Sequence, residues 1–358
     1  MPFADHLPHP RDLVRFGPPA ASNAVALRAG VSVAVPLATL MLTGHLEWAA
    51  YAAFGAFTAL YGRIEGYRRR LPTQLAAAAV LVAATGGGAL LAATSPSNAA
   101  GTWPIVLAAA ATAVVASLIG DAAGWHPVGP LFAVFAIATC AAIPTDSGGV
   151  VASFVVSAAT AAFAVGVGAL GALSRRRRAV HHPARLPFGA RRVVDDPQVL
   201  RHAVRYGLAA LVAGSVANVI GIGHPGWAMV AAIASLVGPD TPGRVLRGLH
   251  RVAGTAVGLV IAAALLSLHL DGWAVVATVV VLQTVTELFV GRNYGFAMIF
   301  ITPMALLMTT MVTVTPTDVL VRDRGVETFV GAVVGVGLAF LATEHRAAVR
   351  TARSTLEA

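Results

Sequence analysis

The feature that most constrains this chain is a series of apolar stretches, many of them about as long as a membrane is thick. A helix needs roughly 20 mostly apolar residues to cross the hydrocarbon core of a bilayer. Of the 358 residues, 57% are hydrophobic and 11% are charged, whereas a soluble domain carries about 25% charged residues. The pattern predicts an all-α polytopic membrane protein with about twelve spanning helices. The predicted spans are 25–43, 46–61, 73–93, 102–120, 128–143, 149–173, 202–221, 226–239, 252–268, 272–290, 294–314 and 326–343.

The basic residues lie mainly between these apolar stretches. The 25 basic residues, all of them arginine, outnumber 16 acidic residues and give a net charge of +9. An excess of arginine in cytoplasmic loops is typical of membrane proteins. With the N-terminus inside, every arginine except Arg322 and Arg324 falls on the inner side, which explains the charge without a nucleic-acid partner. We therefore expect a multi-pass protein of the cell inner (plasma) membrane, with the lipid bilayer around it and both termini cytoplasmic.

The two halves of the chain share landmarks, which predicts an internal repeat. Trp48 and Trp227 occupy matching places, as do the acidic residues Asp121 and Glu287. An even number of spans in each half gives both halves the same orientation, as in parallel-repeat transporters. The expected divisions are a cytoplasmic segment 1–24, a first six-helix repeat 25–173, a cytoplasmic linker 174–201, a second six-helix repeat 202–343 and a cytoplasmic tail 344–358.

Two stretches of the second half carry a resemblance to a known family. Residues 224–266 read HPGWAMVAAIASLVGPDTPGRVLRGLHRVAGTAVGLVIAAALL, and residues 286–307 read TELFVGRNYGFAMIFITPMALL. These resemble the fusaric acid resistance protein-like superfamily, which includes aromatic acid exporters. The matching features are Trp227, the Arg244/Arg247/Arg251 cluster, Gly254-Thr255 with Gly258, Glu287 and Arg292-Asn293-Tyr294. The resemblance implies proton-driven export of small aromatic or other organic acids.

Glu287 and Asp121 are the acidic residues that we single out for proton coupling. A charged side chain at the centre of a spanning helix costs about 2.5–3.5 kcal/mol on insertion scales, so such residues are seldom present without a role. A carboxyl group can carry a proton by alternating between its charged and neutral forms. The competing interpretation is an interfacial acid paired with a nearby arginine, such as Arg292 for Glu287.

Several arginines are candidates for binding the substrate anion. Arg244, Arg247 and Arg251 are spaced to share one helix face, and Asp240 just before them is placed to begin that helix. A guanidinium grips a carboxylate through two hydrogen bonds, although orientation in the membrane and lipid headgroup contact explain such a cluster equally. The further candidates are Arg292, Tyr294 and the repeat-related pair Arg28 and Arg205.

The remaining sequence motifs mainly exclude disulfides, cysteine metal sites and known catalytic sites. Cys140 is the only cysteine, so no disulfide or cysteine metal site is predicted. The glycines of Gly166-x-Gly168-x-x-Gly171 lie inside an apolar stretch and, like Gly254-x-x-x-Gly258 and Gly331-x-x-x-Gly335, suit close helix packing. No P-loop or catalytic motif appears, so we expect no cofactor and no enzyme activity. The alternative functions are a membrane scaffold or accessory subunit and an integral-membrane enzyme. A second copy of the chain, in a homo-oligomer, is a further candidate partner.

Overall fold

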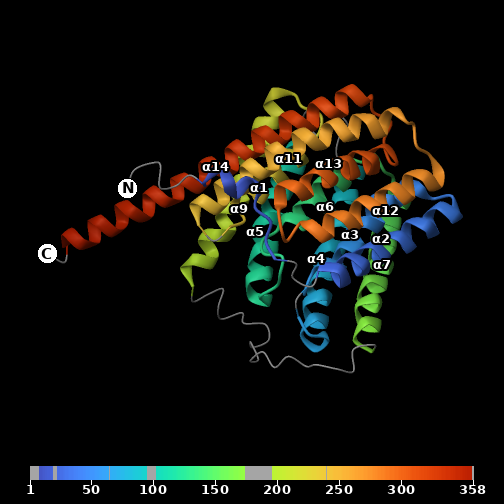
Figure 1. The fold of residues 1–358 in the computed structure, drawn as a ribbon, viewed down its shortest axis with the longest axis horizontal. Helices are drawn as coiled ribbons and strands as arrows, with labels where there is room; N and C mark the ends of the chain where they lie inside the picture. The colour runs from blue at the N-terminus through green and yellow to red at the C-terminus, as the bar shows by residue number, and fades with distance from the viewer. Residues whose placement is uncertain are drawn as a thin grey trace.

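The computed structural model describes residues 8–18, 22–63, 65–94, 102–173, 196–238 and 240–356, and throughout these ranges the chain is helical, with no strand. The first half holds α1 (Pro10–Val14), α2 (Ser22–Thr43), η2 (Leu46–Trp48), α3 (Ala49–Ala56), η3 (Phe57–Leu60), α4 (Tyr67–Thr94), α5 (Thr102–Ala123), α6 (Leu131–Ala141) and α7 (Ser147–Leu173). The second half holds α9 (Pro197–Ile220), α10 (Pro225–Leu236), α11 (Thr241–Ser267), α12 (Gly272–Phe289), α13 (Tyr294–Thr310) and α14 (Thr317–Leu356). Figure 1 shows their arrangement.

The predicted all-α polytopic class is confirmed. Eight of the described helices are long and apolar enough to cross a membrane, namely α2, α4, α5, α7, α9, α11, α12 and α14. The apolar helices α6, α10 and α13 are shorter, so the number of twelve spans stays a prediction. Large apolar side chains such as Leu107, Val219 and Val260 are 59–77% exposed on the outside of the bundle. This surface suits the hydrocarbon of a bilayer, and the chain is a multi-pass membrane protein.

The helix boundaries follow local capping chemistry. The side chain of Asp240 accepts a hydrogen bond from the backbone N–H of Gly243 and begins α11, as the sequence predicts. Asn293 caps α13 in the same way through the N–H of Phe296. An N-cap oxygen satisfies a backbone donor that has no partner within the helix. These caps place the arginines of α11 and the first turn of α13 beside each other.

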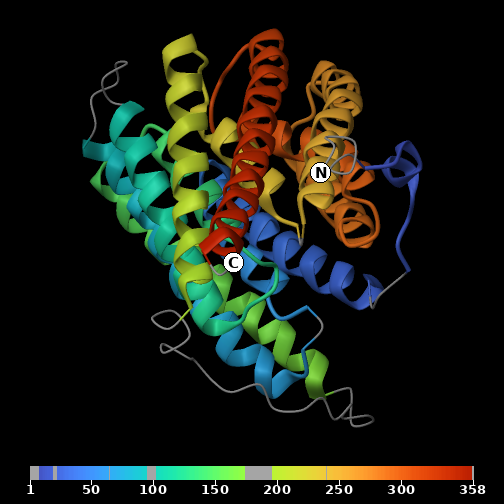
Figure 2. The ribbon, with the colours of Figure 1, turned by 90° about the vertical axis from the view of Figure 1, so that its left-hand side faces the viewer.

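Helix packing recurs between the two halves. In the first half α4 packs against α6 and α7, and α3 packs against α7; in the second half α11 packs against α13 and α14, and α10 against α14. The halves also interlock, because α5 packs against α9 and α12 against α2. Figure 2 shows α9 and α14 running side by side on one face. The predicted domain boundaries stay predictions, and residues 174–195 of the linker lie outside the described residues.

Glycines bring the paired helices into backbone contact. A Cβ atom at Gly331 would overlap the carbonyl oxygen of Ala228, and one at Gly335 would overlap that of Ala232. Gly254 faces the carbonyl oxygen of Gly295 in the same way. The close packing that the sequence predicts for these glycine pairs is therefore confirmed, as expected where small residues let membrane helices approach.

Candidate functional site: a cavity between the two halves

The short helices enclose a cavity in the middle of the bundle. Its volume is about 610 Å³, and residues of both halves line it. Walls come from α3 and α6 of the first half and from α10 and α13 of the second, with contributions from α11, α12 and α14. The helices α3, α6, α10 and α13 are shorter than the roughly 20 residues of a full span. Transporter sites are commonly built from interrupted helices of this kind.

Aromatic and methionine side chains form the apolar part of the cavity wall. Phe57 and Phe132 have ring centroids 5.0 Å apart, and both line the cavity. Met298, Met304 and Met308 of α13 also line it, whereas Met311, which follows the last residue of α13, packs against the neighbouring hydrophobic core. Flat rings and flexible thioethers together suit an aromatic ligand.

Two arginines of α11 and Tyr294 of α13 form the first polar group in the cavity. The guanidinium carbon of Arg247 lies 4.0 Å above the centre of the Tyr294 ring. Arg251, which is 3% exposed, donates a hydrogen bond of 2.8 Å to the Tyr294 hydroxyl. The Nε atoms of both arginines are buried without a hydrogen-bond partner among the described residues. These guanidinium groups therefore retain free donors.

A second polar group contains residues that the sequence did not suggest. Arg324 of α14 is 2% exposed and lines the cavity, although its place in the sequence predicts the outer side of the membrane. Its guanidinium carbon lies 4.8 Å above the Trp227 ring, and His224 stacks against that ring at 4.8 Å. The backbone N–H of His224 donates to the carboxyl group of Glu327, which is fully buried one turn beyond Arg324. The nearest sequence signal was the run of charges 322–327 at the start of the predicted span 326–343.

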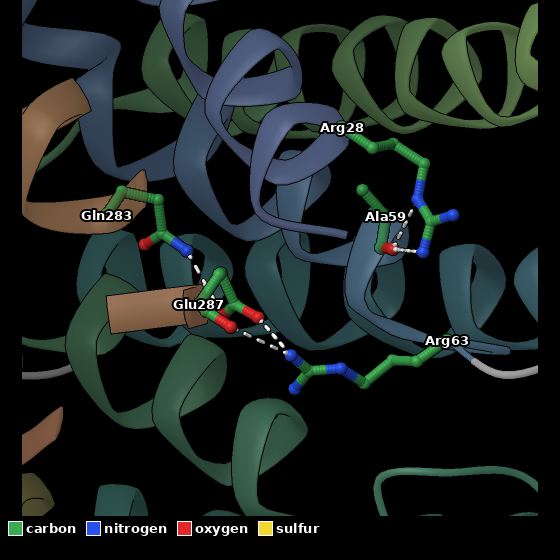
Figure 3. A network of polar contacts seen from close by, with 5 residues as sticks. All are labelled: Arg28, Ala59, Arg63, Gln283 and Glu287. Carbon is green, nitrogen blue, oxygen red and sulfur yellow. Dashed lines mark hydrogen bonds and ion pairs between the residues drawn. The ribbon is translucent and has the colours of Figure 1, made fainter. Parts of the chain in front are cut away.

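Glu287 makes an ion pair across the two halves (Figure 3). Its Oε2 atom lies 2.6 Å from an Nη atom of Arg63, and the side chains are 5% and 24% exposed respectively. Gln283, one turn earlier on α12, donates to the other carboxyl oxygen at 3.4 Å. The partner is Arg63 of the first half rather than Arg292. Because both side chains line the cavity, the pair is in reach of a ligand.

Comparison with known proteins places this cavity in a recognised sequence region. Residues 211–338 match the family model described as fusaric acid resistance protein-like. This part of the chain is thus similar to the fusaric acid resistance protein-like family. The resemblance predicted from the sequence is confirmed over these residues, which hold α10 to α13 and most of the cavity's polar groups.

One of the relatives that the chain matches is named as a membrane protein. The chain is 30% identical over 131 residues to "Uncharacterized membrane protein YvaC" of Bacillus subtilis (strain 168), covering 36% of this chain and 21% of that protein. It is 27% identical over 158 residues to "Uncharacterized protein slr1298" of Synechocystis sp. (strain ATCC 27184 / PCC 6803 / Kazusa), covering 43% of this chain and 20% of that protein. The matches thus span about a fifth of each relative. No solved structure matches this chain.

The structure separates the predicted site residues into two groups. Glu287, Arg247, Arg251 and Tyr294 line the cavity of the fusaric acid resistance-like region. The others lie away from the lining, namely Asp121, Arg205, Arg244, Arg292 and Arg28. Three of these bond to carbonyl oxygens: Arg244 to Leu236, Arg292 to Gly17, and Arg28 to Ala59 as Figure 3 shows. The functional roles of both groups stay predictions.

An N-terminal strap, residues 8–18, covers one end of the site. Asn293 donates hydrogen bonds to the carbonyl oxygens of Leu13 and Arg15 at 3.0 and 3.1 Å. The strap borders a second hollow of about 450 Å³ that shares Arg247 and Tyr294 with the central cavity. Among the described residues, no three His, Cys, Asp or Glu side chains lie close enough to hold a metal ion.

Proposed function

We propose that this chain is part of a transporter that exports small aromatic or other organic acids through the central cavity, coupled to protons. The observation that carries the proposal is a set of three arginines facing an aromatic-lined cavity between the two halves. Within the described parts of the chain, Arg247, Arg251 and Arg324 have no carboxylate within 4.0 Å. A buried positive charge without a partner is costly, so the cavity is suited to an anionic ligand.

The two kinds of cavity wall match the two parts of an aromatic acid. The apolar ring of the substrate would lie against side chains such as Phe57, Phe132 and Met304. Its carboxylate would bind the guanidinium groups, whose planar donors fit a carboxylate bidentately. Binding would neutralise the anion during transit, which matters because an unpaired anion in hydrocarbon is very unfavourable. The chain needs no catalytic residue for this role.

The Arg63–Glu287 pair offers a way to couple transport to protons. A substrate carboxylate that reaches Arg63 would compete with Glu287 for the same guanidinium group. A buried carboxylate that has lost its cation is stabilised by binding a proton. Arrival of substrate anion and protonation of Glu287 would then be linked, so that one proton crosses in the same direction as each anion. Loss of the proton on the other side would restore the ion pair and release the substrate, and the outward gradient of the acid itself would drive export. In this scheme the chain lies in the inner membrane with both termini in the cytoplasm.

Reconstituted vesicles test this proposal. We would measure movement of radiolabelled 4-hydroxybenzoate at pH 8 with and without an imposed pH gradient, using protein-free vesicles to subtract passive permeation. We expect accumulation that an uncoupler abolishes. Glu287→Gln should lose the gradient-driven accumulation, whereas Glu47→Gln, which changes an exposed carboxylate outside the cavity, should retain it.

Two results would contradict the proposal. Movement no faster than in protein-free vesicles would remove the transport role, and chemical conversion of the substrate would point to an enzyme instead. Normal gradient-driven export by Glu287→Gln would remove Glu287 from proton coupling while leaving transport itself in place.

A further inference from the structure

We infer that the cavity selects organic acids carrying two negative charges on a flat apolar body, that is, aromatic dicarboxylates. The inference rests on the proposed function, because it names the substrate class of the same site. Its basis is the number of unpaired guanidinium groups at the cavity and the way in which aromatic rings hold them.

The charges at the cavity do not balance. Arg63 and Glu287 compensate each other at 2.6 Å. Against the three arginines 247, 251 and 324 stands Glu327, one turn along α14 from Arg324, which offsets one positive charge at most. The cavity therefore keeps an excess of at least two positive charges. A monocarboxylate would leave one of them buried and uncompensated, whereas a dicarboxylate would neutralise both.

Stacking leaves the hydrogen-bonding edges of two arginines available. Arg247 lies over the face of Tyr294 at 4.0 Å, and Arg324 lies over the face of Trp227 at 4.8 Å. A guanidinium group that stacks through its flat face keeps its N–H donors pointing outward in the plane. The Nε atoms of both arginines have no hydrogen-bond partner in the described structure. Both residues line the cavity, and each carries a buried donor that no described residue satisfies, so we assign one carboxylate to each arginine.

Arg247 belongs to α11 and lies over Tyr294, whereas Arg324 belongs to α14 and lies over Trp227. The site therefore has two separate points at which a carboxylate can bind. Arg251 lies at the hydroxyl end of Tyr294, and the charges of all three arginines act on that tyrosine. A ligand with two carboxylates on one aromatic ring has one carboxylate for each of these points. The volume of about 610 Å³ lies within the range of about 300–1,000 Å³ typical of small-molecule pockets.

The charge excess belongs to the second half alone. The repeat also pairs Arg70 of the first half with Arg251 of the second. Four residues earlier, the counterpart of Arg247 is Gly66, so only one of these two arginines has an arginine counterpart. Aligning residues 144–146 with residues 316–318 in the same way makes Ala152 the counterpart of Arg324. The pseudo-symmetry therefore does not duplicate the anion site, and we expect one dicarboxylate per chain.

Calorimetry on the purified full chain in nanodiscs at pH 8 tests the inference without any substitution. The probes are isophthalate, its monomethyl ester and benzoate; the ester keeps the body of isophthalate but has one charge. We expect isophthalate to bind about tenfold or more tightly than the other two, because a hydrogen bond to a charged group contributes about 1.5–3 kcal/mol. The stoichiometry should be one per chain.

Equal binding of isophthalate and its monomethyl ester would overturn the dicarboxylate inference and leave the proposed export of organic acids intact. Tighter binding of benzoate would have the same consequence. If none of the three acids bound and 4-hydroxybenzoate did not move across vesicles, the proposed function would fail together with the inference.

A matched pair of variants tests whether Arg324 binds the second carboxylate of the ligand. Arg324→Gln should reduce the preference for isophthalate over its monomethyl ester to about threefold or less. Arg201→Gln is the control, because Arg201 is exposed on α9, bonds only to the carbonyl oxygen of Pro197 among the described contacts, and lies outside the cavity lining. If Arg324→Gln does not fold, Arg247→Gln should show the same loss. An unchanged preference in the folded variants would overturn the assignment.

Discussion

Replacing Arg63 by glutamine should destabilise the protein far more than replacing its partner Glu287 by glutamine. The pair joins the turn after η3 to α12 across the two halves. The two side chains differ in burial. The Glu287 side chain is 5% exposed, whereas that of Arg63 is 24% exposed. Arg63→Gln therefore leaves a carboxylate enclosed without a cation, whereas Glu287→Gln leaves a guanidinium group that still reaches solvent in the cavity.

The expected magnitudes follow from this asymmetry. Removing one partner of a buried ion pair costs about 3–5 kcal/mol when the remaining charge stays buried, which is the case for Arg63→Gln. The amide of Glu287→Gln still accepts a hydrogen bond, so we expect a cost of about 1–2 kcal/mol. The double variant should be close to Glu287→Gln alone, since the buried charge is gone. The coupling free energy between the two positions then equals the Arg63→Gln cost, about 3–5 kcal/mol in magnitude.

A double-mutant cycle measures this coupling. The free energy of unfolding would be obtained from denaturant titrations in mixed micelles, followed by tryptophan fluorescence, for the parent chain, both single variants and the double variant. Glu47→Gln is the control, because its carboxylate pairs with His45 at 3.0 Å but is 54% exposed. Its cost should be below about 1 kcal/mol. The reasoning would be refuted if the losses of unfolding free energy at the two positions were additive. It would also be refuted if Arg63→Gln lost no more unfolding free energy than the control.

Three further predictions follow from single contacts. Gly331→Leu should reduce the yield of folded protein, because the new Cβ atom would meet the backbone of α10, whereas Gly337→Ala on the same helix should be tolerated since nothing lies within 4 Å. Asn293→Ala should release the N-terminal strap by removing two hydrogen bonds, seen as faster hydrogen exchange in the strap; unchanged exchange would show that other contacts hold it. Burial lowers the pKa of His224 below 6.5, so the unfolded chain binds the proton more readily. The unfolding free energy should therefore fall as pH falls below about 6.5, and His224→Gln should lessen that fall.

Local patterns were sufficient to predict the helical class and several contacts. Asp240 begins α11 because an acceptor side chain followed by proline caps a helix in any fold. Gly331 and Gly335 pack against α10 because small residues spaced four apart form a smooth helix face. Arg247, Arg251 and Tyr294, named from the sequence, do line one cavity. Their proximity was not predicted, because it depends on how α11 packs against α13.

The sequence by itself determined that the chain folds as helices in lipid, because a bilayer leaves each long apolar segment few ways to satisfy its backbone. Only the tertiary structure decided which charges meet. Arg63 and Glu287 are 224 residues apart, and their pairing depends on how the halves interlock. Arg324 had the pattern of an outer-loop residue but points into the cavity, because its face of α14 packs against the ring of Trp227. Burial and partner choice are properties of the packed bundle, and no spacing along the chain encodes them.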